Sequence, residues 1–315
     1  MYVSKSKSSV ALTYEKDPKT VYIGGLVGYN TNTIQKSWNY GVVTATGNTE
    51  LCAGGIVGYS TGAIVECANY GSIEGNIGAS NAYYAGIAGY LASNTFAKIT
   101  KCGSYASITG SNAGGIVGVS MGAIDECYSN ANISGVHIGG LAYNIKQGTS
   151  QSKSYMRNCM TDGSSLYGEG SKAVVCGAVY QIDVSKSHLA YCEKIFTSAK
   201  FSGDGKYYYE TTSNIRGCNK IGSISYYVDP DAFNNSIHVA RAGNITRSNG
   251  DFSWSWKNIF QWDMTGKGKA DIQISDEEAK GANNYTIFTG NGNNYSTNVW
   301  SFEAGKYPQL KNVAK

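Results

Sequence analysis

Proline and charged side chains are scarce in this sequence. Of its 315 residues only 3 are proline, where roughly 5% is usual, and 15% are charged, where about 25% is usual. Collagen is excluded, because it needs abundant proline and a glycine at every third position. A disordered polyampholyte is excluded as well, because 42% of the residues are apolar and 25 are tyrosine.

Charges are scattered, and long apolar runs are missing. The 26 basic and 22 acidic residues give a net charge of +4 and form no concentrated Lys/Arg face of the kind that reads nucleic acid. No stretch approaches the ~18 to 20 apolar residues that span a bilayer. The residues after Met1 lack the apolar core of a secretion signal, so a signal was either removed or never part of this chain, which leaves the compartment open.

Glycine is abundant, and much of it belongs to a repeat. The chain has 40 glycines, about one residue in eight, where roughly 7% is usual. A phrase built on two adjacent glycines returns in steps of 25 to 37 residues, which indicates a fixed unit with loop insertions. The phrase Gly-Gly-Leu-Val-Gly-Tyr stands at 24–29, and its variants stand at 54–59, 85–90, 114–119, 139–143 and 176–180.

A second phrase lies between these, with the pattern Ile-x-x-Cys-x-x-Tyr-Gly-x-Ile. Its anchor position is occupied by Ser37, Cys67, Cys102, Cys127, Cys159, Cys192 and Cys218. A large aliphatic residue stands three places before each anchor: Ile34, Ile64, Ile99, Ile124, Met156, Leu189 and Ile215. The position six places after the anchors is aliphatic in five units and serine in units five and six, where the pattern is expected to be lost. Its residues are Val43, Ile73, Ile108, Ile133, Ser165, Ser198 and Ile224.

These units predict an all-β fold, a β-solenoid of about seven coils in which each unit forms two short β segments with glycine-bearing bends. A helical repeat is disfavoured, because a glycine inside a helix costs ~1 kcal/mol and each unit carries several. A propeller blade needs four strands in ~40 to 50 residues, so these units are too short. Side chains alternate along a strand, so an Ile and a Cys three residues apart require a bend between them, which the sequence does not place.

The repeats divide the chain into three regions. We expect an N-terminal cap or lead-in strand over 1–20, β-solenoid repeats over 21–224, and a non-repeating, β-rich C-terminal cap over 225–315 that packs on the end of the solenoid. Interior strands cannot spare a backbone N–H, so prolines should lie outside the repeats, as they do at Pro18, Pro230 and Pro308.

The cysteines are predicted to be structural. Those at the anchor position should form a column inside the coils, about one strand spacing apart and pointing the same way. A ladder of buried free thiols is the favoured interpretation, and disulfide pairing is the main alternative. Metal binding is least supported, because there is no Cys-x-x-Cys pair and the 3 histidines are isolated. Cys52 and Cys176 fall outside the column and are the candidates for a reactive thiol.

The segment 54–73 resembles the GLUG-motif repeat proteins of bacteria, and 299–311 resembles the segment that closes runs of such repeats. Together these matches cover about 20–224 and 284–311. In units five and six, Tyr143 and Tyr180 stand one place earlier than the tyrosines of the first units. The resemblance implies a right-handed parallel β-helix on a surface or secreted protein with adhesive or recognition roles, and it supplies no catalytic residues.

The sequence contains no recognisable catalytic motif. A zinc peptidase would need His-Glu-x-x-His and a serine hydrolase Gly-x-Ser-x-Gly, and neither string is present. The glycine phrases lack the Gly-Lys-Ser/Thr of a phosphate loop. The charged residues just before the anchors alternate in sign from one unit to the next: Lys36, Glu66, Lys101 and Glu126. Attraction between opposite charges on paired neighbouring strands explains this pattern without a catalytic role.

Aromatic side chains are the remaining candidates for binding. Tyrosines recur at two positions of the first units, where stacked columns are most simply structural: Tyr29, Tyr59 and Tyr90, then Tyr40, Tyr70 and Tyr105. A second group of aromatic residues breaks the repeat pattern: Tyr207, Tyr208, Tyr209, Trp254 and Trp256. We expect these residues either to cover the end of the solenoid or to form an aromatic platform that binds a sugar or a protein.

The function expected from these features is non-enzymatic. The chain should be an extracellular or cell-surface recognition module, adhesin-like, that binds a host or environmental glycan or protein through a solenoid face or the aromatic cap. We expect no cofactor, no metal, no nucleic acid and no direct membrane insertion. Two alternatives stay open: a carbohydrate-active enzyme of the lyase or hydrolase type working through paired acids on a β-helix, and a phage receptor-binding or structural stalk protein.

Overall fold

The computed structural model describes most of the repeat region and part of the C-terminal region. The described residues are 10–13, 20–47, 50–78, 80–146, 148–149, 154–183, 190–193, 195–197, 199–204, 207–209, 212–216, 237–239, 272–274, 280–289 and 295–311. Three of the anchor and candidate binding residues expected from the sequence lie outside them: Cys218, Trp254 and Trp256.

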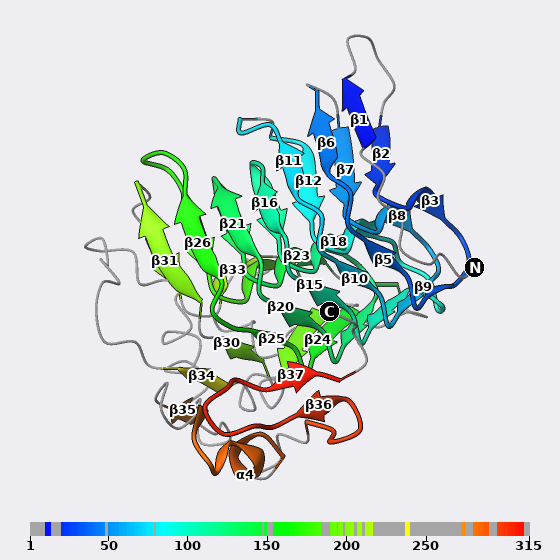
Figure 1. Ribbon diagram of the computed structural model, residues 1–315. Coiled ribbons are helices and arrows are strands. Elements are labelled where there is room, and N and C mark those ends of the chain that lie inside the picture. The colour runs from blue at the N-terminus through cyan, green and yellow to red at the C-terminus, as the bar shows by residue number, and fades with distance from the viewer. Residues whose placement is uncertain are drawn as a thin grey trace.

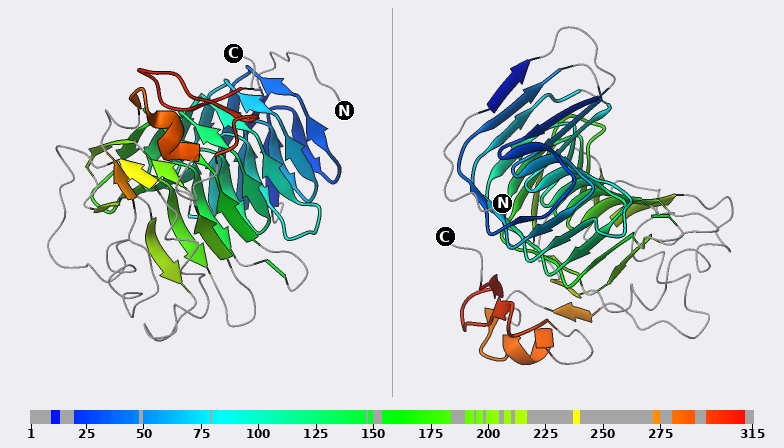
Figure 2. Two further views of the ribbon diagram at one scale, coloured as in Figure 1. Left: turned by 90° about the horizontal axis from the view of Figure 1, so that it is seen from below. Right: turned by 90° about the vertical axis from the view of Figure 1, so that its right-hand side faces the viewer.

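Five parallel sheets, A to E, run the length of the described region (Figure 1). Each strand pairs in register with the strand at the same place in the next repeat, as Tyr29 pairs with Tyr59 and Tyr59 with Tyr90. The chain is thus all-β, with parallel sheets stacked in register, consistent with a β-helix or solenoid. Figure 2 shows the strands of each sheet stacked one behind another when the molecule is turned.

The five sheets are made of short strands. Sheet A contains β5 (Trp38–Asn39), β10 (Ala68–Asn69), β15 (Gly103–Ser104), β20 (Tyr128–Ser129), β25 (Met160–Thr161), β30 (Phe196–Thr197), β34 (Ile237–Val239) and β35 (Ile272–Ile274). Sheet B contains β1 (Val10–Thr13), β6 (Val43–Thr46), β11 (Ile73–Gly75), β16 (Ser107–Thr109), β21 (Asn132–Gly135), β26 (Ser165–Gly168) and β31 (Lys200–Gly203). Sheet C contains β2 (Thr20–Gly24), β7 (Glu50–Gly54), β12 (Ala82–Ala85), β17 (Asn112–Gly114), β22 (His137–Gly139), β27 (Val174–Cys176) and β32 (Tyr207–Tyr209). Sheet D contains β3 (Val27–Asn30), β8 (Val57–Ser60), β13 (Ala88–Leu91), β18 (Val117–Ser120), β23 (Ala142–Lys146), β28 (Val179–Asp183) and β33 (Thr212–Arg216). Sheet E contains β4 (Ile34–Gln35), β9 (Ala63–Val65), β14 (Lys98–Thr100), β19 (Ala123–Asp125), β24 (Ser154–Arg157) and β29 (Ala190–Glu193).

The chain visits the sheets in the order C, D, E, A, B and then returns to C. We call β2 to β6 coil 1, β7 to β11 coil 2, and so on to coil 6, which is β27 to β31. Each repeat therefore folds as five short strands, where two β segments were expected. The difference arises because each phrase contains a bend: the glycine pair separates sheet C from sheet D, and the residue before the anchor separates sheet E from sheet A.

The bend before the anchor has an unusual backbone conformation. The residue that precedes the anchor has a positive φ in each of the first coils, between 48° and 57°, and these residues are Lys36, Glu66, Lys101, Glu126 and Asn158. Residues other than glycine rarely adopt this left-handed conformation, and asparagine is one of the few that tolerate it well. The bend that the sequence required between the aliphatic residue and the anchor is therefore placed at one residue.

The core has two lobes that meet at a narrow waist. One hydrophobic cluster, which includes Ile64, lies between sheets D and E, and the other, which includes Ile73, lies between sheets B and C. At the waist Gly55 faces Asn69: a Cβ added to Gly55 would lie 2.2 Å from the Asn69 side chain. Asn69 is fully buried. Its side-chain amide donates a hydrogen bond to the backbone oxygen of Gly71 and accepts one from the side chain of Asn39. The waist is therefore lined by hydrogen-bonded polar side chains between two apolar lobes.

The register of the later coils differs from the one read off the sequence. Leu166 pairs with Ile133, and Phe201 pairs with Leu166, so the position expected to have decayed to Ser165 and Ser198 holds apolar residues. One extra residue between β25 and β26 shifts the pattern in coil 5. Tyr143 does not break the register either, because Ala142 and Asn144, on its two sides, pair with Val117 and Val119.

Two of the expected anchor assignments also differ. Cys192 pairs with Met156, so it continues the aliphatic column of sheet E and not the cysteine column. The residue at the anchor position is buried Ile195, because its neighbour Phe196 pairs with Met160. After coil 6, Ile215 pairs with Ile182 in sheet D, whereas the sequence pattern had placed it in the aliphatic column, three residues before Cys218.

Connections between strands vary in length at only some corners of the coil. Ser60 and Ile64 are four residues apart in coil 2, but Ile145 and Met156, at the same two positions of coil 5, are 11 apart. The sheet B to sheet C connections vary as well, whereas sheet C leads to sheet D over the same short step in every coil from 1 to 6.

The described part of the C-terminal region packs on the flank of the solenoid. It consists of 280–289 and 295–311, called the closing region here, with helix α4 (Asn284–Thr289) and the antiparallel pair β36 (Trp300–Ser301) and β37 (Gln309–Leu310). Its apolar side chains cluster with residues of sheet A, so it covers a face of that sheet (Figure 1). The end of sheet A is extended by β34 and β35, which also belong to the region expected as the C-terminal cap. No described helix has the length and apolar character that a membrane span requires.

Candidate functional site: two rows of tyrosines

Tyrosines from sheets C and D meet along one corner of the solenoid. The ring of Tyr22, on sheet C, lies 4.7 Å from that of Tyr59, on sheet D, and Tyr83 of sheet C lies 5.6 Å from Tyr143 of sheet D. Outward side chains of two successive sheets touch only where the sheets' outer faces turn toward each other, so this corner is concave. We call its members the corner row: Tyr22, Tyr29, Tyr59, Tyr83, Tyr90, His137, Tyr143 and Tyr180.

Glycine allows the two sheets to approach so closely. A Cβ added to Gly58 of sheet D would lie 2.5 Å from the backbone nitrogen of Ile23 in sheet C. In coil 5 the residue at this position is Tyr143, and in coil 6 it is Tyr180, and their rings stack at 5.0 Å. Tyr143 and Tyr180, which stand one residue early in the sequence pattern, therefore occupy the corner position that glycine holds in the earlier coils.

The first three coils carry the most regular part of the corner row. Tyr29, Tyr59 and Tyr90 stack with ring centroids 5.2 Å apart and ring planes within 11° of parallel. Tyr29, at the end of this stack, is 52% exposed. Stacked rings cover each other's faces, so Tyr29 and Tyr59 present ring edges and hydroxyl groups to the outside, whereas the Tyr90 hydroxyl donates to Sδ of Met121 at 3.1 Å.

Burial favours the neutral form of the Tyr59 and Tyr90 phenols. It raises the pKa of Tyr59, and it raises the pKa of Tyr90 to about 12, with the neighbouring tyrosines adding to both shifts. Neutral phenols both donate and accept hydrogen bonds.

Polar side chains border the corner row in the later coils. Nδ1 of His137 lies 3.0 Å from Oδ1 of Asn112, and the imidazole ring packs 4.9 Å from that of Tyr180. On sheet D, the amides of Asn144 and Gln181 both donate to the carboxylate of Asp183, at 2.9 and 2.7 Å. The corner therefore combines ring surface with hydrogen-bonding groups.

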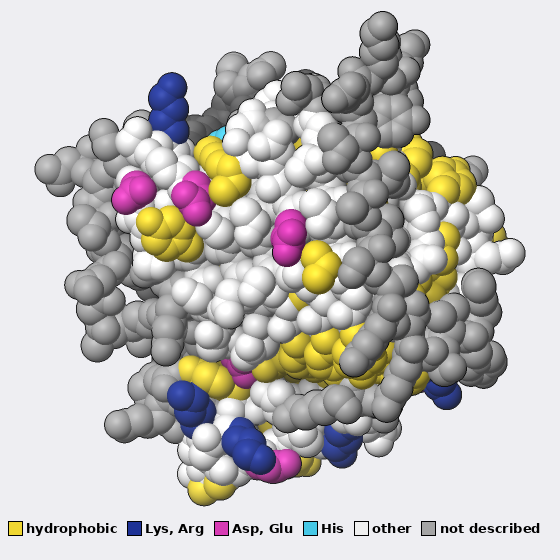
Figure 3. Space-filling view, turned by 45° about the horizontal axis from the view of Figure 1, so that its top comes forward, with side chains coloured by type: hydrophobic (Ala, Val, Ile, Leu, Met, Phe, Trp, Pro, Cys, Tyr) yellow, Lys and Arg dark blue, Asp and Glu magenta, His cyan; other side chains and the backbone are white. Residues whose placement is uncertain are grey.

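A second row of tyrosines lies on the outer face of sheet A. Tyr40, Tyr70 and Tyr105 stack at 5.0 Å with planes within 9° of parallel, and Tyr128 follows at 5.5 Å. Trp300 of the closing region then meets Tyr128 edge-on. Figure 3 shows a band of hydrophobic side chains beside the closing region. This row continues into an interface that the chain itself occupies.

A buried carboxylate fixes the closing region to sheet A. Asp162 is 3% exposed and accepts hydrogen bonds from the Tyr128 hydroxyl at 2.6 Å and from the Asn130 amide at 2.7 Å. The amide of Gln309, in the closing region, donates to the same carboxylate at 3.1 Å. Burial raises the pKa of Asp162, and these three donors oppose the shift. The hydroxyl of Tyr295 adds a bond to the backbone oxygen of Cys159. Asp162 thus has a structural role.

The residues proposed from the sequence as a binding group are only partly described. Tyr207, Tyr208 and Tyr209 form β32 and pair with Val174, Val175 and Cys176, so they continue sheet C next to the corner row. Trp254 and Trp256 lie outside the described residues. Sequence reasoning missed Tyr22 and Tyr83 as members of the same surface, although both stand at the same place in the strand before the glycine phrase.

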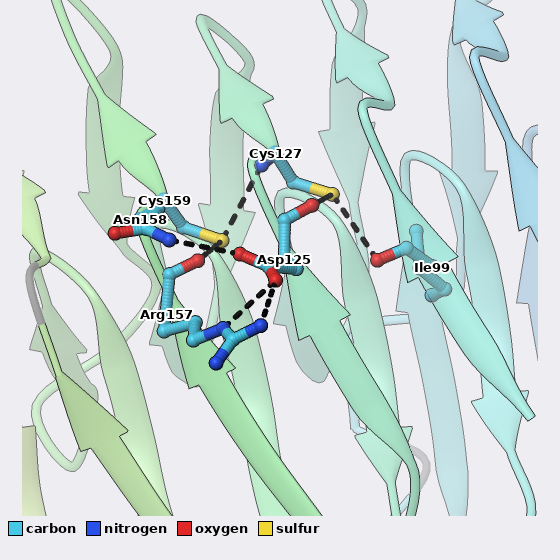
Figure 4. A network of polar contacts seen from close by, with 6 residues as sticks. All are labelled: Ile99, Asp125, Cys127, Arg157, Asn158 and Cys159. Carbon is cyan, nitrogen blue, oxygen red and sulfur yellow. Dashed lines mark hydrogen bonds and ion pairs between the residues drawn. The ribbon is translucent and has the colours of Figure 1, made fainter. Parts of the chain in front are cut away.

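The cysteines at the anchor position are buried free thiols: Cys67, Cys102, Cys127 and Cys159. Each thiol lies near the backbone oxygen two residues before it, as in Cys127 to Asp125 at 3.2 Å, and Cys127 also reaches the oxygen of Ile99 in the preceding coil (Figure 4). The Ser37 hydroxyl makes the same local bond in coil 1. The thiols therefore satisfy carbonyl groups at the left-handed bend.

Charged residues beside the column pair with their neighbours. The Arg157 guanidinium lies 2.7 Å from a carboxylate oxygen of Asp125, and the Asn158 amide donates to the other oxygen (Figure 4). Lys36 and Glu66 form a longer pair at 3.9 Å. Burial, with Asp125 beside it, raises the pKa of Glu126 against the opposing charges of Lys101 and Arg157. Among the described residues, no three His, Cys, Asp or Glu side chains cluster in a way that would hold a metal.

The buried thiols are expected to resist modification. Burial raises the pKa of Cys52 to about 12, and it also raises the pKa of Cys102 and Cys127. The thiolate is the reactive form, and in the unfolded chain its pKa returns to about 8.5. A thiol reagent at pH 8 should therefore label the native protein far more slowly than protein unfolded in guanidinium.

The same shift gives a pH dependence of stability. Above pH ~8.5 the unfolded chain releases thiol protons that the native state retains, so the free energy of unfolding should fall as the pH rises from there toward the raised pKa. Urea melts at several pH values would measure this. Rapid labelling of Cys52 in the native protein at pH 8, or a stability that rises between pH ~8.5 and ~10, would contradict the burial described here.

Comparisons with known proteins gave no match. A scan against family models, a search of curated proteins and a search of solved structures each found nothing similar to this chain.

Proposed function

We propose that this chain is a non-enzymatic recognition module of an extracellular or cell-surface protein, adhesin-like, that holds a glycan on a face of the solenoid. We take the fold to be a right-handed parallel β-helix of about seven coils. The resemblance of 54–73 to GLUG-motif repeats supports both proposals. No catalytic role is assigned to any residue.

One observation carries the proposal: the fold places a tyrosine at equivalent positions of successive coils, on outward faces where burial is incomplete. Tyr29, Tyr59 and Tyr90 repeat in this way on sheet D. Aromatic side chains with a polar group suit surfaces that are apolar on one side and wet on the other. A regular array of one side chain type is suited to a ligand that also repeats, such as a linear glycan.

The test is a broad binding screen. The purified protein, at micromolar concentration, is applied to an array of host, plant and microbial glycans and to a panel of extracellular host proteins. Binding to a set of related glycans is expected. A blank glycan array would overturn the proposal, and binding to proteins alone would replace the glycan with a protein partner.

A further inference from the structure

We propose that the corner row is a track for one extended, uncharged glycan chain with (1→4)-linked pyranose units, lying along the solenoid axis with about one sugar unit per coil. This inference rests on the proposed function and goes beyond it by naming the site, the ligand class and the direction in which the ligand lies. Four features of the described residues support it.

The first feature is the interval between equivalent rings. Tyr29, Tyr59 and Tyr90 follow one another at 5.2 Å along the coils. Pyranose units in an extended (1→4)-linked chain follow one another at close to the same interval. An extended polypeptide repeats on one face about every 6.6 to 6.8 Å, so its side chains would lose register with these rings after two coils. The spacing therefore favours a glycan over a peptide strand.

The second feature is the mixture of ring and polar groups. The row begins at Tyr29, half of which is exposed, and the later coils add the partly exposed His137 and Asp183, which are positioned by the buried amides of Asn112 and Gln181. A sugar ring offers C–H groups to an aromatic surface and hydroxyl groups to amides and phenols. The later part of the row on sheet A is not open to a ligand in this way, since it runs into the closing region through buried Tyr128 and Trp300.

The third feature is the low charge of this surface. Within the described strands of sheets C and D, from coil 1 to coil 6, the charged residues are Glu50, Lys146 and Asp183. Glu50 accepts a hydrogen bond from Thr20, and Lys146 pairs in register with Asp183 across neighbouring strands. With two acids and one base, these described strands carry no cluster of cations that could neutralise an acidic polysaccharide. The ligand it fits is uncharged.

The fourth feature is the way the rings are turned. Because Tyr29, Tyr59 and Tyr90 cover each other's faces, a sugar meets ring edges and hydroxyl groups along most of the row. Tyr22 is tilted by 42° to Tyr59 and breaks this arrangement on coil 1. Each sugar unit therefore gains little from any one ring, and affinity should accumulate with chain length.

The experiment measures affinity against chain length by calorimetry. The probes are uncharged β-(1→4)-linked oligomers of two, four and six units built from glucose, mannose or N-acetylglucosamine, with a hexamer of galacturonic acid for comparison. At least one uncharged series should bind, with the hexamer about tenfold or more tighter than the dimer. Affinity that does not change with length, or that is highest for the acidic hexamer, would overturn the inference.

Two variants locate the site. Tyr29→Ala removes an exposed ring at the end of the stack, so the fold should be kept, and affinity for the hexamer should fall several-fold. Tyr59→Phe removes one hydroxyl and keeps the stacking, and it should weaken binding several-fold with an unchanged melting temperature. The matched control is Tyr40→Ala, which removes the coil 1 ring of the equivalent stack on sheet A and should leave affinity unchanged.

The variants also separate this inference from the proposed function. If the hexamer binds and Tyr40→Ala alone weakens it, the protein is still a glycan-binding module but the corner row is the wrong site. If no glycan binds the unaltered protein, the proposed function fails together with the inference.

Discussion

Replacing Gly55 with alanine should lower the free energy of unfolding by about 3 kcal/mol or more, the upper end of what overpacking costs. The added Cβ would lie 2.2 Å from the side chain of Asn69 and 2.3 Å from the backbone oxygen of Gly86 in the next coil. Neither atom can move away easily. The oxygen belongs to the backbone of the neighbouring coil, and the Asn69 side chain is held by hydrogen bonds to Asn39 and Gly71.

Urea unfolding followed by circular dichroism would measure this loss. The matched control is Gly28→Ala, because the nearest atom to its added Cβ is the Tyr22 backbone oxygen at 3.1 Å, a contact that a small shift relieves. Gly28→Ala should therefore cost clearly less. If both variants unfold at the same urea concentration, the waist is not packed as described.

Replacing Trp300 with alanine should weaken the docking of the closing region by about 3 to 5 kcal/mol, the usual cost of removing a buried tryptophan. Trp300 is fully buried, and its ring lies 6.3 Å from Tyr128 of sheet A and 5.4 Å from Tyr295 of its own region. Alanine would leave a cavity between the two surfaces. Because the solenoid sheets do not depend on this ring, the effect should be confined to the closing region and the sheet A face beneath it.

Hydrogen exchange of 295–311 and of β20 would report the change. Faster exchange is expected in the closing region and at Tyr128, with little change in sheets B to E. Phe302→Ala is the control, since Phe302 is only partly buried on the same cluster and should give a smaller effect. Unchanged exchange in Trp300→Ala would show that the other contacts, among them the hydrogen bonds of Asp162 and Tyr295, are enough to hold the closing region in place.

Much of the fold could be predicted from the repeats, because each phrase fixes positions that pair in register. Ile64, Ile99 and Ile124, aligned from the sequence, do stand opposite one another in sheet E. The left-handed bend could not be placed, since lysine and glutamate carry no signal for a positive φ. Coil 6 was misaligned because the pattern was matched on cysteine. Leu189 and Cys192 have the spacing of the motif, but the residue at the anchor position is Ile195.

The candidate site was predicted less completely than the fold. The stacks of Tyr29 with Tyr59 and of Tyr40 with Tyr70 follow from their equal positions in the repeat, and both are present. That Tyr22 joins the first stack could not be foreseen, because alternation along a strand says which residues face outward and not whether the next corner is convex or concave. That depends on how closely the glycine of sheet D approaches the backbone of sheet C.

The connections between strands differ in how much variation in length they tolerate. The steps of 25 to 37 residues between glycine phrases are absorbed mainly where sheet D leads to sheet E and where sheet B leads to sheet C. The glycine corner keeps one length, because its backbone atoms already touch the next coil. New loops can therefore be gained or grafted at these two corners without disturbing strand register. The loops on the surface can change while the pairing of the strands stays the same.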